Sequence, residues 1–259
     1  MEINDRLFEL YKNELYSRAE IFDAIDRYNA SVNDKSNATA CPLLLADNDY
    51  YARWPLSLTS KNYQSADVKI MIYGQETCGW GGVYSRDQSL ENIIGDYNFF
   101  TSGDAFNYKG PTPFWSFFLE TVKSLSAKNS DKKFGYLWNN IVKIGYAEKA
   151  GLPDDFYDDI VRPYFHGIVI KELEILKPDY IIFLTGPNYD HIIDEIFNKP
   201  QRDSLSGFEE RQFCEIHIPN VKNSVRTYHP AYLARGKGGE IWCKHLDRIA
   251  DEITRDINR

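Results

Sequence analysis

The sequence has no long apolar run. None of the hydrophobic stretches in its 259 residues approaches the length that is needed to cross a membrane. The first ten residues, MEINDRLFEL, are acidic, whereas a secretory signal peptide begins with basic residues that precede an apolar segment. We therefore expect a cytoplasmic protein that does not contact membranes.

Closely spaced cysteines are also lacking. Disulfide frameworks are uncommon in chains of this size, and a structural zinc ion or iron–sulfur cluster usually involves at least one close cysteine pair. No C-x-x-C pair occurs among the four cysteines, which are Cys41, Cys78, Cys214 and Cys243. Cys243 and His245 are two residues apart in a predicted helix and so point to different faces, which argues against joint metal ligation. We expect free thiols, no metal site and no cofactor.

The chain lacks a net positive charge as well. Its formal charge of −8 at neutral pH counts against extensive nonspecific contact with nucleic-acid phosphates. Residues 222–248 differ, with a formal charge of +4 from Lys222, Arg226, Arg235, Lys237, Lys244 and Arg248 against Glu240 and Asp247. This stretch predicts either a local basic face that binds phosphates or an ordinary solvated helix face.

The apolar pattern that is present indicates a soluble α/β protein. Hydrophobic residues make up 43% of the chain and charged residues 26%, as in ordinary globular proteins. Residues 4–28 carry apolar positions at three- and four-residue spacings, which predicts one amphipathic helix. From residue 68 onward, apolar strand patterns alternate with helical ones, which favours a mainly parallel sheet with helices on both faces.

The strands and helices are expected at specific segments. Strand patterns occur in VKIMIY, LWNNIVKIGY, DYIIFLT, FCEIHI and SVRTYH, the second of which also fits an extended segment. Helical patterns occur in PFWSFFLETVKSL, YDDIVRPYFHGIVIKELEILK, GPNYDHIIDEIF and GEIWCKHLDRIADEITRDI. In the second of these helices, Pro163 and Gly167 are expected to cause a break or a kink.

Polar side chains follow three of the predicted strands. They are Gly74-Gln75-Glu76 after the first, Asn139-Asn140 with Lys143 around the second, and Thr227-Tyr228-His229-Pro230 after the last. Ligands of open α/β sheets bind outside the carboxyl ends of the strands. These segments are therefore the candidate functional site.

The order of these segments resembles the uracil-DNA glycosylase superfamily. IMIYGQET is similar to the superfamily's first motif, a strand followed by Gly-Gln-Asp-Pro or Gly-x-Asn-Pro, and TYHPAYLARG is similar to its second, His-Pro-Ser or His-Pro-Ala. LWNNIVK and EILKPDYIIFLTG occur between them in the expected order. The resemblance covers about residues 65–257 and implies a three-layer α/β/α domain over 65–259, preceded by an amino-terminal helical extension over 1–64.

The resemblance also implies a reaction and a set of roles. The reaction is hydrolysis of the N-glycosidic bond of uracil or a related damaged base in single- or double-stranded DNA. His229 would donate to the developing base anion and Glu76 would position water. Gln75 and Asn140, or Asn139 if the register slips by one residue, would contact the base.

An aromatic side chain should stack on that base. Phe114 in TPFW is the first choice, with Phe99 and Phe100 as alternatives. The segment after His229 would approach DNA, with Tyr232 or Leu233 inserted as a wedge and Arg235 and Lys237 on phosphates.

The sequence departs from the superfamily pattern after Glu76. Thr77 stands where the first motif usually has proline, and CGWGG is an unusual continuation. The iron–sulfur branch shares YHPA, but its cysteine spacing is absent, so that cofactor is not carried over. These departures leave two alternatives to a glycosylase open: a catalytically silent protein that binds a nucleobase or nucleic acid, and a protein-interaction module that uses the acidic surface and the first helix.

Each candidate residue also has a structural interpretation. Glu76 fits a solvated loop acid, and His229 fits a structural hydrogen-bonding residue. Asn139 and Asn140 fit the close of a strand. Most of the aromatic residues from Phe114 to Phe118 fit a helix that faces the core.

Overall fold

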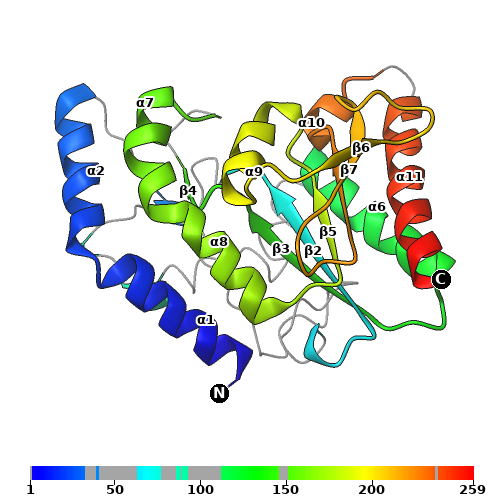
Figure 1. Ribbon diagram of the computed structural model, residues 1–259, viewed down its shortest axis with the longest axis horizontal. Helices are drawn as coiled ribbons and strands as arrows, with labels where there is room; N and C mark the ends of the chain where they lie inside the picture. The colour runs from blue at the N-terminus through cyan, green and yellow to red at the C-terminus, as the bar shows by residue number, and fades with distance from the viewer. Residues whose placement is uncertain are drawn as a thin grey trace. The chain divides into compact units, whose positions relative to one another are not determined.

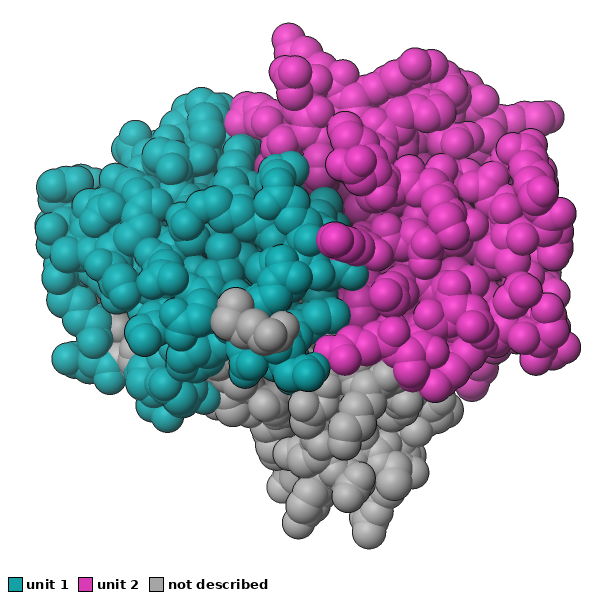
Figure 2. All heavy atoms as spheres, turned by 60° about the horizontal axis from the view of Figure 1, so that its bottom comes forward, with its two compact units in different colours: residues 1–55, 75–105, 139–176 teal, residues 56–74, 106–138, 177–259 magenta. Residues whose placement is uncertain are grey.

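The chain forms two compact units. The computed structural model describes residues 2–32, 39–40, 63–76, 86–87, 89–92, 112–145, 151–236 and 239–259. Unit 1 contains residues 1–55, 75–105 and 139–176, and unit 2 contains residues 56–74, 106–138 and 177–259; Figure 2 colours them teal and magenta. The domain boundary expected between residues 64 and 65 stays a prediction.

A mixed α/β architecture is built around a mostly parallel sheet. Its strand order among the described residues is β3-β2-β5-β8-β7-β6 (Figure 1). The strands are β2 (Val68–Gly74), β3 (Phe134–Asn140), β5 (Tyr180–Phe183), β6 (Arg202–Ser204), β7 (Phe213–Ile216) and β8 (Asn223–Thr227). β2, β5 and β8 are parallel, whereas β7 runs antiparallel to β8 and to β6. The expected mainly parallel sheet is therefore confirmed, with an antiparallel edge.

Most of the sheet belongs to unit 2, and its central strands are buried. Every residue of β5 and all but Lys69 of β2 are buried, which explains their continuous apolar sequences. The last two residues of β3, Asn139 and Asn140, belong to unit 1, as do Gln75 and Glu76 directly after β2. The boundary between unit 2 and unit 1 therefore falls, in the sequence, at the carboxyl ends of β2 and β3.

One face of the unit 2 sheet packs against α9 (Asp190–Ile196), which follows the 3₁₀ turn η4 (Pro187–Tyr189). In the parallel register, Phe183 of β5 lies opposite Tyr73 on one side and Arg226 on the other, so the three side chains share a face. The rings of Phe183 and Phe197, which follows α9, lie 6.2 Å apart, and Arg226 binds Asp190 of α9.

The opposite face packs against α6 (Pro113–Lys128) and α11 (Glu240–Ile257), and the short α10 (Pro230–Leu233) follows β8. Thr227, next to Arg226 on β8, points to this side, where its hydroxyl contacts the imidazole of His245 in α11. The indole N–H of Trp242 in α11 donates to Glu120 of α6 over 2.6 Å. Helices thus cover both faces of the sheet in unit 2.

Unit 1 contains α1 (Ile3–Tyr11), the π-helical turn η1 (Lys12–Tyr16), α2 (Ala19–Val32), α7 (Asp154–Phe156), the π-helical turn η3 (Tyr157–Val161) and α8 (Arg162–Leu176). The short strands β1 (Thr39–Ala40) and β4 (Ile144–Gly145) pair antiparallel. Among the described helices, none combines the length and the apolar character that crossing a membrane requires.

Two helix expectations in unit 1 are corrected by the structure. The single helix expected over residues 4–28 is interrupted at Ser17 and Arg18, because the π turn closes there: the Ser17 N–H donates to the Lys12 carbonyl, and Arg18 pairs with Glu20 of α2. Pro163 and Gly167 were expected to cause a break or a kink; the break is absent, since helical structure continues from Asp154 to Leu176, and a kink stays a prediction. The π turn just before Pro163 accommodates a residue that has no N–H and a bulky ring.

Candidate active site

His229 is held in a defined orientation directly after β8. It is the N-cap residue of α10, and the Ala231 N–H donates to its Nδ1 over 3.2 Å. Partial burial, with a smaller contribution from the positive charge of Arg235, lowers the pKa of His229 to about 4. The ring is therefore neutral at pH 7. Because Nδ1 accepts a hydrogen bond, the single ring proton is on Nε2, which is a neutral donor.

Phe114 is the one aromatic residue at the start of α6 that faces this imidazole. Its ring is half-buried and is stacked on that of His229, with centroids 6.0 Å apart and planes inclined by 26°. Its neighbours Trp115, Phe117 and Phe118 are buried, which confirms that most of this aromatic group belongs to the core. Trp138 of β3 lies behind Phe114, at 6.3 Å between ring centroids.

The end of β5 packs closely against the backbone before His229. Gly186 donates its N–H to the Thr227 carbonyl over 3.0 Å and has a positive φ of 73°. A Cβ at Gly186 would lie 3.4 Å from the His229 nitrogen, so this left-handed conformation and close approach favour glycine. The contact between Thr227 and His245 fixes the same strand end from the other face.

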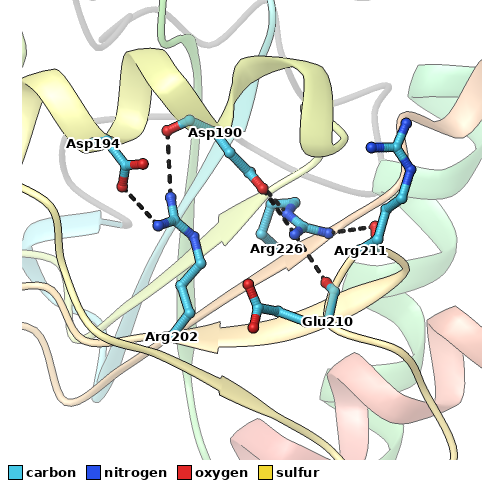
Figure 3. A network of polar contacts seen from close by, with 6 residues as sticks. All are labelled: Asp190, Asp194, Arg202, Glu210, Arg211 and Arg226. Atoms are coloured by element: carbon cyan, nitrogen blue, oxygen red, sulfur yellow. Dashed lines mark hydrogen bonds and ion pairs between the residues drawn. The ribbon is translucent and has the colours of Figure 1, made fainter.

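A partly buried ion pair holds β8 three residues before His229 (Figure 3). The guanidinium of Arg226 donates twice to the carboxylate of Asp190, at 3.0 Å each, and also to the carbonyls of Glu210 and Arg211. Arg202 donates to Asp194 over 2.6 Å beside it. Arg226 is fully buried and each of its three guanidinium nitrogens donates a hydrogen bond, so it stabilises the strand end and does not belong to a basic surface.

Glu76 lies in unit 1, two residues after β2. It is buried, with 8% of its surface exposed, and its Oε1 accepts the Gly151 N–H over 2.8 Å. Burial raises the pKa of this carboxyl, and the Gly151 hydrogen bond lowers it to a smaller extent. The simple interpretation of Glu76 as a solvated loop acid is therefore wrong. Gln75 is half-buried, and its carbonyl accepts the Val142 N–H over 3.0 Å.

Asn139 and Asn140 end β3, also in unit 1, and both are buried. Oδ1 of Asn139 accepts the backbone N–H of Asn140 over 2.8 Å, and its amide group donates to Glu172 of α8 over 3.2 Å. Glu172 also pairs with Lys143 and accepts the hydroxyl of Tyr11. Asn139 thus has a structural role at the strand end, and the expected contact of Asn140 with a base stays a prediction.

The proposed DNA-contacting residues after His229 differ in exposure. Tyr232 is 53% exposed, whereas Leu233 is 1% exposed and is therefore not available as a wedge. Arg235 is exposed, and Lys237 lies outside the described residues. Phe99 and Phe100, the alternatives to Phe114, also lie outside them, as do Thr77 and the CGWGG segment.

Most of the basic stretch 222–248 is engaged within the protein. Lys222 pairs with Asp179, and Arg248 pairs with Glu252. Lys244 donates to the Gly207 carbonyl and lies over the ring of Phe208. Arg226 is buried and does not contribute to a surface charge, and the choice between a local basic face and an ordinary solvated helix face stays a prediction for the rest of this stretch. On α11, Cys243 is exposed and His245 is buried, which confirms that they point to different faces.

The structure therefore brings His229 and Phe114 together in unit 2, and places Gln75, Glu76 and Asn140 in unit 1. The sequence patterns did not predict the buried hydrogen bonds of Tyr11, Glu172 and His245. The position of Glu172 could have been recognised from the sequence, because it falls on the same helix face as the apolar residues Ile168, Val169 and Leu176. A charged side chain on such a face requires a buried partner.

The sequence matches no protein-family model and no curated protein at a significant level. Any assignment of function therefore rests on the residues themselves.

Proposed function

We propose that the protein is a DNA glycosylase that hydrolyses the N-glycosidic bond of uracil or a related damaged base, with the three-layer α/β/α fold of the uracil-DNA glycosylase superfamily. The observation that carries the proposal is His229: a neutral imidazole whose proton is placed on Nε2 and which is stacked on a half-buried phenylalanine. The order of the sequence motifs and the helices on both faces of the mostly parallel sheet support it.

The reaction would proceed with defined roles for each residue. Water adds to C1′ of the sugar, and the bond between C1′ and the base nitrogen breaks with its electron pair on the departing base. The Nε2–H of His229 stabilises the negative charge that develops on a base oxygen. A neutral Nε2–H suits this role because it can donate a hydrogen bond to the oxygen without transferring its proton to the base.

Glu76 would accept the proton of the attacking water. Burial raises the pKa of this carboxyl, which makes its carboxylate form a stronger base than an exposed one. Asn140 would hydrogen-bond the base edge and Phe114 would stack on the base. Tyr232 and Arg235, both exposed, would contact DNA, and Tyr232 is the wedge candidate.

The test is release of uracil from single-stranded and duplex oligonucleotides by the full chain. His229→Ala should lower the rate about 100- to 1,000-fold, as loss of one donor to a developing anion does. Glu76→Gln should lower it about 100- to 10,000-fold, the usual range for loss of a general base. His191→Ala, which removes an exposed imidazole from α9, is the matched control and should keep full activity.

A binding protein of the same fold is the second candidate, because the Gly151 N–H already occupies one oxygen of Glu76. If folded wild-type protein releases no base from uracil or from a panel of damaged bases, the glycosylase proposal is wrong. Binding of a uracil oligonucleotide that weakens in His229→Ala would then support the second candidate.

A further inference from the structure

We infer that Glu172 and Tyr11 are positioning residues for Asn140, so that the first helix of the chain is part of the machinery that holds the base-reading amide. This inference rests on the proposed function for the role of Asn140. The contacts that carry it all lie within unit 1 and connect α1, the end of β3 and α8.

The centre of this arrangement is a carboxylate without exposure to solvent. Glu172 is 0% exposed and sits on the buried side of α8. Its Oε1 accepts the Tyr11 hydroxyl over 2.5 Å and the Asn139 amide over 3.2 Å, while Oε2 pairs with Lys143. Tyr11 and Asn139 are 0% exposed and Lys143 is 1% exposed. Four polar side chains therefore form one buried polar cluster.

The cluster connects to the candidate site through Asn139. Its amide nitrogen donates to Glu172 and its Oδ1 accepts the backbone N–H of Asn140, so the orientation of the Asn139 side chain is fixed from both ends. An asparagine amide that is held in this way places the backbone of the next residue. Tyr11 and Lys143 hold Glu172 in turn, so Tyr11 of α1 is connected to Asn140 through three successive hydrogen bonds.

Stability alone is a weak reason for such a cluster. A buried ion pair is often replaceable by apolar side chains of similar volume without loss of stability, because desolvation of the two charges offsets their attraction. Its advantage is geometric, since directional bonds define one arrangement where apolar packing allows several. A fixed amide at the end of β3 is what the recognition of one base edge requires.

The experiment compares Tyr11→Phe with Tyr28→Phe in the full chain. Both substitutions remove only a hydroxyl, and both hydroxyls donate to a carboxylate in unit 1: Tyr11 to Glu172, and Tyr28 to Asp155 over 3.0 Å. Both tyrosines are buried. Asn139→Ala is a third variant, which removes both links at once and does not depend on the fit of a phenylalanine.

The first measurement is amide hydrogen–deuterium exchange, which requires no activity. In Tyr11→Phe, exchange at Asn140 should accelerate about tenfold or more, the effect of losing a hydrogen bond to a charged acceptor. It should accelerate at least as much in Asn139→Ala and stay unchanged in Tyr28→Phe. Unchanged exchange at Asn140 in both Tyr11→Phe and Asn139→Ala would overturn the inference.

The second measurement is the steady-state kinetics of base release by the same variants. Loss of base positioning should raise KM or lower kcat/KM for the uracil oligonucleotide in Tyr11→Phe by about tenfold at equal folded fraction, and leave Tyr28→Phe at the wild-type value. Faster exchange at Asn140 without any kinetic change would show a purely structural cluster and would overturn the positioning role. If wild-type protein releases no base, the proposed function fails by itself, and the exchange measurement still decides whether the cluster holds Asn140.

Discussion

The ring of Phe114 is stacked on the imidazole of His229, although the two residues lie at the starts of two different helices, α6 and α10. Phe114 is only half-buried, while Phe117, three residues later on the same helix, is fully buried. Two phenylalanines of one helix therefore have different surroundings, and substitutions at the two positions should have different consequences.

Phe117→Ala should destabilise the fold by about 3–5 kcal/mol, because it leaves a cavity in the core. Phe114→Ala should cost less stability and instead weaken nucleobase binding by about 1–3 kcal/mol, the contribution of one base stacked on an aromatic ring. Urea unfolding and affinity for a uracil oligonucleotide measure the two effects. Unchanged affinity in Phe114→Ala would contradict its assignment as the stacking residue.

Tyr232 and Leu233 are neighbours on α10, but Tyr232 is exposed and Leu233 is buried in the core. Leu233→Ala should lower the free energy of unfolding by about 2–5 kcal/mol. Tyr232→Ala should change it by no more than about 0.5 kcal/mol, since the side chain is largely exposed. Fluorescence anisotropy with labelled duplex DNA should show weaker binding for Tyr232→Ala. Equal DNA affinity for this variant and wild type would remove Tyr232 from the DNA-contacting residues.

The pH dependence of stability should reflect two imidazoles, the partly buried His229 and the buried His245. The pKa values of His229 and His245 are lowered from 6.5 to about 4, mainly by burial. Between these values the unfolded chain binds more protons than the folded one, so both residues make stability fall as the pH decreases from about 7 to about 4. The pKa values of buried Glu76 and partly buried Asp190 are raised, so these two carboxyls act in the opposite direction as the pH falls.

The contribution of one imidazole is therefore best measured as a difference between variants. His229→Gln should reduce the loss of stability between pH 7 and pH 5 in urea unfolding, relative to wild type. His191→Gln provides the control for removal of an exposed imidazole. An identical pH dependence in wild type and His229→Gln would show that His229 is not buried as a neutral ring.

The ion pair between Arg226 and Asp190 should be a major contributor to the stability of unit 2. Arg226→Met should destabilise the fold by roughly 3–5 kcal/mol, because it leaves the partly buried Asp190 without its partner and two carbonyls without a donor. Lys222→Met removes an exposed ion pair at the opposite end of β8 and should cost about 0–1 kcal/mol. Similar losses in the two variants, measured by urea unfolding, would contradict this difference.

Much of the fold followed from local sequence patterns. Continuous apolar runs predicted β2 and β5, and proline before an aromatic segment predicted the start of α6. These features depend on propensity and burial, which the side chains specify locally. The π turns around Lys12 and before Pro163 could not be read in this way, because the extra residue in a turn depends on packing against other parts of the chain.

In the candidate site, too, some features could be predicted from the sequence and others could not. The sequence by itself determined that polar residues lie at or just after the ends of β2, β3 and β8, among them Glu76, Asn140 and His229, because side-chain type and its position relative to an apolar run are local properties. Only the tertiary structure decided that Leu233 is buried and Tyr232 is exposed. It also decided that Arg226 forms an ion pair with Asp190, and that the hydroxyl of Tyr11 donates to Glu172. Burial and partner choice depend on residues far apart in the chain, and no local pattern contains them.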